Sequence, residues 1–218
     1  MANKKPTFKN LKALCDDKAH ERQSCKKGYR ALLQSESVSD LMRTWREHLY
    51  DIVGDRYSDI VVSDFARYYE AMREEVNAAG FYFNEAPQIT RRSDIVLVGD
   101  MEEELSVRGY GTIYVLGAAT VHAYGNTTIY SKRQAEAKVV LHDYAHGDVT
   151  MGTAVCYNRS DIVSSVETEC HDAASVVITG TGVLNDYGHR AIRAYGNSLV
   201  RTALTRNITL TDNATIEQ

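Results

Sequence analysis

The chain reads His-Ala-Tyr-Gly-Asn-Thr-Thr-Ile at residues 122–129 and Arg-Ala-Tyr-Gly-Asn-Ser-Leu-Val at residues 193–200. Around these two copies, an apolar residue recurs every eight residues. The apolar positions are Ile113, Val121, Ile129 and Ala137, and then Val176, Leu184, Ile192, Val200, Ile208 and Ile216. A fixed step of this kind is typical of repeat proteins, in which each short unit buries its apolar side chains only by stacking on its neighbours.

A step of eight residues fits about five residues of strand followed by a tight turn. The Gly-Asn pairs that begin at Gly125 and Gly196 supply the positive φ that a sharp corner requires. We therefore expect a β-solenoid, with two octads per coil in a flattened form or three in a triangular one. Its handedness is left open. The two apolar series are out of phase by one residue, which predicts an insertion, deletion or bulge between Tyr130 and Val176.

Side chains alternate along a strand, so the repeat also predicts which residues face the interior. Val121 and Ala123 are expected to point inward, as are Ile192 and Ala194. The residues between and beside them point outward: His122, Tyr124, Arg193 and Tyr195.

Before residue 80 the apolar period changes to that of helices. Leu41, Trp45 and Leu49 recur every four residues, and Ser37 stands three residues before Asp40 as in a capping box. Four short helices are expected in this half. The predicted fold class is α+β, with a small N-terminal helical bundle in residues 1–90 and a β-solenoid of eight-residue strand-turn repeats in residues 91–218.

Composition excludes several classes of protein. No apolar run approaches the roughly 18 residues that span a bilayer, and no signal peptide follows Met1. Four cysteines in 218 residues are too few for a small disulfide scaffold, so a reducing cytoplasm is the expected location. The net charge of −4 predicts no general attraction to nucleic acid or anionic lipid.

Nucleic-acid binding nevertheless stays open, because arginines lie among tyrosines near the end of the repeat. Contacts to phosphates and bases would use the arginines near Tyr187 and Tyr195, which are Arg190, Arg193, Arg201 and Arg206. The other interpretation is a solvated surface, since this half of the chain is acidic.

Potential ligands for a metal cluster only at His142–His146 and Cys170–Asp172. A zinc site could combine Cys156, Cys170, His171 and one of the earlier histidines. The spacing matches no finger or ribbon, so neither a metal nor a cofactor is expected. No phosphate loop, nucleophile–base order or paired catalytic acids stand out, and no catalytic activity is expected.

The octads at residues 123–129 and 194–200 resemble the octad-repeat β-solenoid tails of uncharacterised proteins from bacterial phages and mobile elements. The stretch from Tyr29–Leu33 to Leu41–Trp45 is similar to the small helical segment that precedes such tails. The family has no established activity. The resemblance implies a phage or mobile-element origin and a host protein as partner, for example a CRISPR effector or another defence nuclease in the bacterial cytoplasm.

We therefore expect a non-catalytic interaction protein that inhibits such a partner. The candidate contact residues are Trp45, if it is not part of the core, and His122, Tyr124, Tyr187, Arg193, Tyr195 and Arg201. A homodimer through an open end of the solenoid is a further expectation. The alternatives are a solenoid enzyme of acyltransferase type with His122 or His142 as base, and a structural or assembly protein of a virion.

Overall fold

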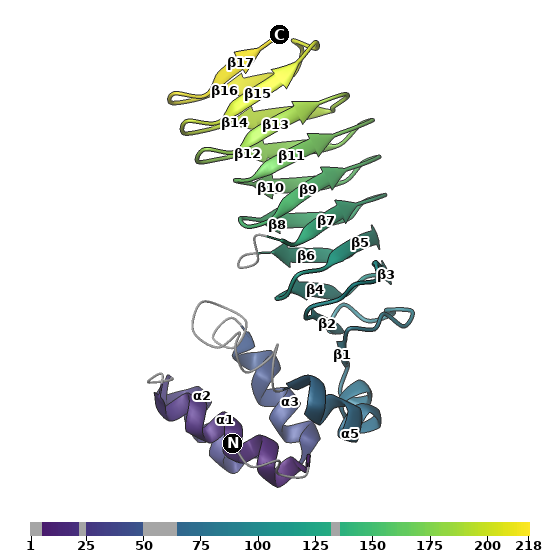
Figure 1. Ribbon diagram of the computed structural model, residues 1–218, viewed down its shortest axis with the longest axis vertical. Coiled ribbons are helices and arrows are strands. Elements are labelled where there is room, and N and C mark those ends of the chain that lie inside the picture. Colours follow the sequence, from purple (N-terminus) through teal and green to yellow (C-terminus); the bar gives the residue numbers. More distant parts are fainter. Residues whose placement is uncertain (1–5, 22–24, 50–64, 132–135) are drawn as a thin grey trace. The chain divides into compact units, whose positions relative to one another are not determined.

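The computed structural model describes residues 6–21, 25–49, 65–131 and 136–218 (Figure 1). The chain divides into two compact units, Met1–Phe83 and Asn84–Gln218. Helices make up most of the described part of the first unit, and the second is a parallel β-solenoid of about eight coils. The predicted α+β class with a β-helix is therefore confirmed.

The first unit is held together by an aromatic core. Its described elements are α1 (Phe8–Glu21), α2 (Lys26–Gln34), α3 (Val38–Glu47), α5 (Phe65–Ala78) and the short strand β1 (Phe81–Phe83). Helix α3 begins as predicted, because the Ser37 hydroxyl accepts a hydrogen bond from the N–H of Asp40 and the Asp40 carboxylate accepts one from the N–H of Glu36. None of the described helices combines the length and apolar character needed to cross a bilayer.

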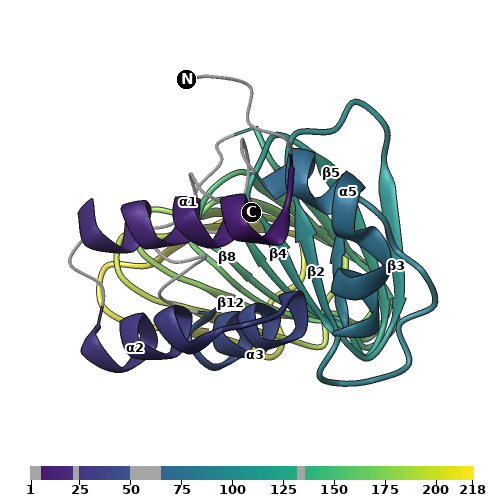
Figure 2. The same cartoon turned by 90° about the horizontal axis from the view of Figure 1, so that it is seen from below.

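The second unit consists of two parallel sheets. Even-numbered strands form one sheet and odd-numbered strands β3 to β17 form the other, so each coil contributes one strand to each. The strands are β2 (Ile95–Val98), β3 (Leu105–Gly109), β4 (Thr112–Val115), β5 (Thr120–Gly125), β6 (Thr128–Ser131), β7 (Lys138–Leu141), β8 (His146–Val149), β9 (Thr153–Cys156), β10 (Asp161–Ser164), β11 (Glu167–Cys170), β12 (Ser175–Ile178), β13 (Val183–Asp186), β14 (Ala191–Ala194), β15 (Leu199–Thr202), β16 (Ile208–Leu210) and β17 (Thr215–Glu217). Two octads per coil is thus the form adopted, and in Figure 2 the coils lie one behind another.

The register explains the phase shift in the repeat. Regular coils take 16 residues, as where Ile192 pairs with Ile208. In the middle of the solenoid the coils take 18, 15 and 14 residues, as the pairing of Ala123, Leu141, Cys156 and Cys170 shows. Ala123 and Cys170 are therefore 47 residues apart, one fewer than three regular coils need. The predicted irregularity lies in this stretch, and the strands stay in register because the corners absorb it.

Inward-facing side chains form the core as predicted. Val121, Ala123, Ile192 and Ala194 are each at most 1% exposed. Burying a Val or Ile contributes on the order of 1.5–3 kcal/mol relative to leaving it exposed. A single coil cannot bury its inward-facing side chains by itself. The coils before and after it cover them, so neighbouring coils stabilise one another.

The corners have the conformation that the Gly-Asn pairs predict. Gly125 has a φ of 75° and Gly196 a φ of 70°. A Cβ on Gly125 would also lie 2.9 Å from the carbonyl oxygen of Gly109 in the preceding coil. In the three coils that follow Gly125, the same corner is occupied by Asp143, Asn158 and Asp172, with φ of 56°, 58° and 59°. These short polar side chains tolerate the left-handed region better than other non-glycine residues.

Candidate binding surface

A column of aromatic side chains runs along the outer side of the odd-numbered sheet. We call it the ring ladder, and its members are Tyr124, His142, Tyr157, His171 and Tyr187. Each ladder residue lies where an odd-numbered strand ends, one coil after the previous member. The backbone N–H of each later member donates to a carbonyl of the coil before it, as in His142 N to Ala123 O at 2.9 Å. The parallel register therefore places the five rings in one line.

The rings stack face to face. Centroid distances from Tyr124 to Tyr187 are 4.3, 5.2, 4.9 and 5.0 Å, with interplanar angles of 4°, 9°, 16° and 16°. These distances match the roughly 4.8 Å between neighbouring strands. Because the ring faces cover one another, the ladder presents ring edges to solvent, with phenol hydroxyls alternating with imidazole nitrogens.

A guanidinium closes one end of the ladder. Arg108 pairs with Tyr124 across β3 and β5, and its guanidinium carbon lies 4.0 Å from the centre of the Tyr124 ring. Tyr124 is thus held between a cation on one side and the His142 ring on the other. Such a cation–π contact contributes about 0.5–1 kcal/mol at an exposed site.

Hydrogen bonds at the corners hold the ladder in place. The Asp143 carboxylate accepts from the N–H of Gly125 at 3.2 Å, and the Asp172 carboxylate accepts from the N–H of Asn158 at 3.2 Å. Each bond joins the corner directly after a ladder residue to the corner of the preceding coil. The backbone that carries the rings is therefore tied from coil to coil.

Comparison with known protein families, with curated proteins and with solved structures gives no match.

Three titratable side chains, Glu104, His122 and His142, contact one another beside Tyr124, the first member of the ladder; we call them the relay. The Nε2 atom of His122 lies 3.1 Å from a carboxylate oxygen of Glu104, and its Nδ1 atom lies 3.2 Å from Nε2 of His142. If His122 donates to Glu104 from Nε2, its Nδ1 accepts a hydrogen bond from the Nε2–H of His142. Burial lowers the pKa of His142, and the neighbouring His122 and Arg108 lower it further. The neutral form of the His142 imidazole is thus favoured where it contacts His122.

The structure brings together four of the residues singled out from the sequence. Tyr124 and Tyr187 are ladder members, and His122 stacks against His142 at 5.5 Å. Arg201 lies on the outer side of the same sheet, where its Nε atom donates to Glu217 at 2.9 Å.

Three other candidates lie elsewhere. Arg193 belongs to β14 in the even-numbered sheet, and Tyr195 follows the same strand, so neither shares a sheet with the ladder. Trp45 is 3% exposed and packs on Phe65 with ring centroids 5.0 Å apart. Trp45 therefore belongs to the helical core, and the condition under which it would be a contact residue is not met.

The sequence did not indicate four of the six side chains in the column formed by Arg108 and the ladder as surface contacts. These four are Arg108, His142, Tyr157 and His171, of which His142 was considered only as a catalytic base or metal ligand and His171 only as a zinc ligand. Their signal is a planar side chain followed by a residue that tolerates the corner: Arg108-Gly109, Tyr124-Gly125, His142-Asp143, Tyr157-Asn158, His171-Asp172 and Tyr187-Gly188. Searching only for Tyr-Gly finds the two most regular members.

The candidate metal ligands are not gathered into a site. Within the residues that the structure describes, no three His, Cys, Asp or Glu side chains are placed to hold a metal ion. Cys156 and Cys170 are adjacent in register and buried. Burial raises the pKa of Cys170 to about 12 and the pKa of Cys156 well above its usual value, so both thiols keep their protons at neutral pH.

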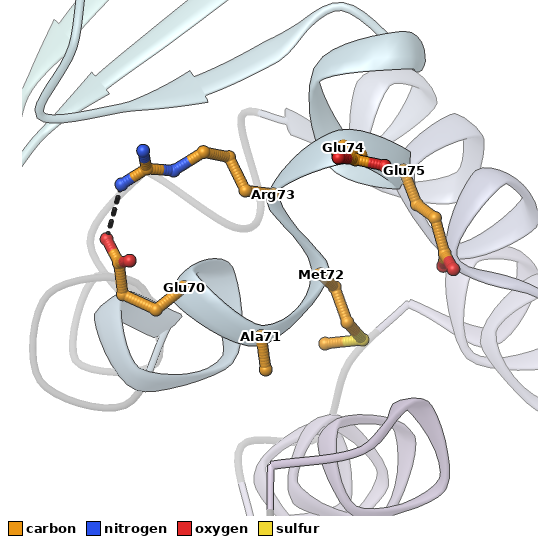
Figure 3. Close-up of a pocket in the computed structure, with 6 residues that line it drawn as sticks. All are labelled: Glu70, Ala71, Met72, Arg73, Glu74 and Glu75. Atoms are coloured by element: carbon orange, nitrogen blue, oxygen red, sulfur yellow. Dashed lines mark hydrogen bonds and ion pairs between the residues drawn. The ribbon is translucent and has the colours of Figure 1, made fainter.

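Helix α5 carries a shallow hollow, which Figure 3 shows in close-up. Six consecutive residues, Glu70 to Glu75, line about 390 Å³ around Met72, whose backbone is not helical (φ −131°, ψ 23°). The polar side chains there are exposed, and Glu70 and Arg73 pair with each other at 2.7 Å. The hollow is the inside of an irregular turn of a single helix.

Proposed function

We propose that this chain is a non-catalytic protein-interaction module that binds its partner through the ring ladder. The observation that carries the proposal is the uninterrupted stack of five aromatic rings on an outer surface. Aromatic side chains are the commonest energetic anchors of protein interfaces. Stacking has already restricted the rotamers of these rings, so a partner that binds them immobilises little that was mobile before.

Charges of both signs border the ladder and favour a specific partner over a general one. Glu169 lies in β11 beside His171, at 3.5 Å, and Arg201 and Glu217 pair two coils further on. Charges in such an arrangement contribute mainly to specificity and register. The mixture of signs suits a protein surface better than the continuous negative charge of a nucleic acid.

The resemblance of the octads to phage and mobile-element solenoids suggests which class of protein the partner belongs to. We propose that the chain originates from such an element, acts in the cytoplasm of the bacterial host, and inhibits a host defence protein such as a CRISPR effector. The ladder would then occupy a surface that the nuclease needs for its own substrate or for its conformational change.

The test measures DNA cleavage by purified CRISPR nucleases with and without the chain. A double variant, Tyr157→Ala with Tyr187→Ala, breaks the ladder. Its matched control is Tyr114→Ala with Tyr130→Ala, which removes a stacked pair of tyrosines, 5.2 Å apart, from the even-numbered sheet. We expect inhibition by the wild type and the control, and at least a tenfold loss of potency in the ladder variant. Equal potency of all three proteins would contradict a role for the ladder.

A homodimer is a separate proposal about assembly. In the last coil, Leu210 of β16 is 40% exposed and Ile216 of β17 is 37% exposed, whereas Ala194 and Val200 in the coil before are fully buried. A second copy would cover these side chains. Light scattering of the wild type and of a variant with Leu210→Lys and Ile216→Lys tests this, with a dimer expected only for the wild type.

The relay of Glu104, His122 and His142 favours one alternative from another class. A carboxylate that orients one histidine, which in turn meets a second, is an arrangement that can remove a proton from a substrate. It would suit a solenoid enzyme of acyltransferase type with His122 or His142 as base. Acetyl-CoA binding that is lost in His142→Ala but retained in His146→Ala would support this alternative.

A further inference from the structure

The ring of Tyr187 has one open face. His171 covers the other face at a centroid distance of 5.0 Å, and the Tyr187 residue is 68% exposed. Since Asp186 pairs with Thr202, the position that follows Tyr187 in the ladder belongs to Ala203. A methyl group stands there in place of a ring. Within the described residues, no other ring and no cation stacks on Tyr187.

The position beside the open face is preformed. The Thr202 hydroxyl accepts from the N–H of Leu204 at 2.9 Å and lies 3.2 Å from its carbonyl oxygen. The same hydroxyl also contacts the buried carboxylate of Asp186. These bonds hold the backbone on either side of Ala203, the register position next to Tyr187, where the side chain is only a methyl group. Leu204, which is 36% exposed, adds an apolar side chain beside it.

The surroundings of the space favour a neutral ring as its occupant. Arg201 stands two residues before Ala203 on the outer side of β15 and is already paired with Glu217 at 2.9 Å, so this pair offers a second cation no net attraction. A neutral ring needs no charged partner, gains contact with Leu204, and repeats the ring-on-ring stacking of the ladder. Coils lie about 4.8 Å apart, which is the room that one stacked ring requires.

We propose that the open face of Tyr187, above Ala203 and beside Leu204, binds a single aromatic side chain of the partner protein. This inference rests on the proposed interaction function, because it names the chemistry of that partner's anchor. The residue would add a sixth ring to the ladder and complete it in trans.

The test uses N-acetyl-tryptophanamide as a neutral aromatic probe and the ¹³C-methyl NMR signal of Ala203 as the reporter. A ring stacked on Tyr187 lies next to this methyl group and shifts its signal through the ring current. We expect a saturable shift in the wild type and its loss in Tyr187→Ala. Ala203→Tyr supplies the missing ring within the chain but lacks the reporter methyl group, so probe binding to this variant is measured by saturation-transfer NMR on the probe, and we expect none.

The matched control is Tyr110→Ala, because Tyr110 is 50% exposed but lies outside the ladder. We expect it to bind the probe as the wild type does. Saturation transfer to the probe from folded Ala203→Tyr, as strong as from the wild type, would overturn the proposal. So would a larger shift with N-acetyl-arginine amide, which would make the occupant a cation. A shift that depends on protein concentration without probe would make the occupant a second copy of this chain and would likewise overturn it.

The two proposals fail in different ways. If the probe binds at Ala203 and no CRISPR nuclease is inhibited, the site stands and the proposed partner is wrong. If a nuclease is inhibited and both Tyr187→Ala and Ala203→Tyr leave potency unchanged, the proposed function stands and the open face is not its anchor.

Discussion

His189 and Asp186 form a pair whose side chains are completely buried, with Nδ1 of the imidazole 2.8 Å from a carboxylate oxygen. The Nε2 atom lies 2.7 Å from the carbonyl oxygen of Arg206, which can only accept a hydrogen bond. A proton therefore resides on Nε2. A second proton must lie between Nδ1 and the Asp186 carboxylate, because that contact is also a hydrogen bond. Together the two side chains hold both protons and carry no net charge, which is the form that a buried site tolerates.

Removing the imidazole in His189→Ala leaves the buried Asp186 carboxylate with donors from Gly188 and Thr202 but without the group that balances its charge. We expect a loss of about 3–5 kcal/mol in the free energy of unfolding. Urea denaturation measures it. The control His146→Ala removes an exposed histidine of β8 and is expected to change stability by no more than about 0.5 kcal/mol. Similar free energies of unfolding of the two variants would show that the buried pair does not stabilise the fold.

Tyr157→Ala removes the central ring of the ladder. Two stacks disappear, to His142 and to His171, and each contributes about 0.5–1.5 kcal/mol beyond burial. We expect a loss of about 1–3 kcal/mol in urea denaturation. Tyr195→Ala is the control, since this tyrosine follows β14 and has no ring partner among the described residues. Equal losses in both variants would mean that ring stacking adds nothing to ordinary burial.

The lowered pKa of His142 predicts that acid weakens the solenoid. Burial is its largest cause, followed by His122 and Arg108, while Asp143 acts in the opposite direction. The unfolded chain, with a pKa near 6.5, then binds the proton more tightly than the fold does. The contribution of His142 to stability is complete above about pH 6.5 and decreases as the pH falls toward the lowered pKa.

The measurement is urea denaturation at pH 7.5 and pH 5. His142→Phe keeps a ring in the ladder and removes the titration. We expect this variant to lose less stability than the wild type between the two pH values. A larger loss in His142→Phe than in the wild type would contradict the lowered pKa of His142.

Thiol reactivity distinguishes Cys25 from the other three cysteines. Cys25 is exposed at the start of α2, whereas Cys15, Cys156 and Cys170 are buried. Burial raises the pKa of Cys15 to about 12, so it too is a protonated thiol at neutral pH. Brief treatment with N-ethylmaleimide at pH 7.5 should modify one cysteine of the folded protein and four in urea. Mass spectrometry of Cys25→Ser should then show no modification before unfolding, and labelled Cys156 in the folded protein would contradict the buried position.

Much of the solenoid could be predicted because its physics is periodic. Val121 and Ile192 mark buried positions, and Gly125 and Gly196 mark corners, since a strand of alternating side chains needs both at constant spacing. The number of octads per coil could not be predicted. An octad has the same pattern whether two or three of them close a coil, and only the pairing of Ile192 with Ile208 distinguishes the forms.

The ladder was only partly visible in the sequence for two reasons. Its middle members, His142, Tyr157 and His171, lie where coils of 18, 15 and 14 residues interrupt the step of eight. The corner residue there is Asp or Asn in place of Gly. The pair of Asp186 and His189 had no signal at all, because such residues are most often exposed and only the fold shows that they are buried.

The constant register across coils of unequal length makes the coil a unit that can be copied. Duplicating the 16 residues from one ladder position to the next would add one strand to each sheet, one ring to the ladder and about 4.8 Å of reach. Duplication of one coil within the gene can therefore lengthen the contact surface of the protein by one ring at a time. The longer surface can match a larger partner, and the core side chains of the existing coils stay the same.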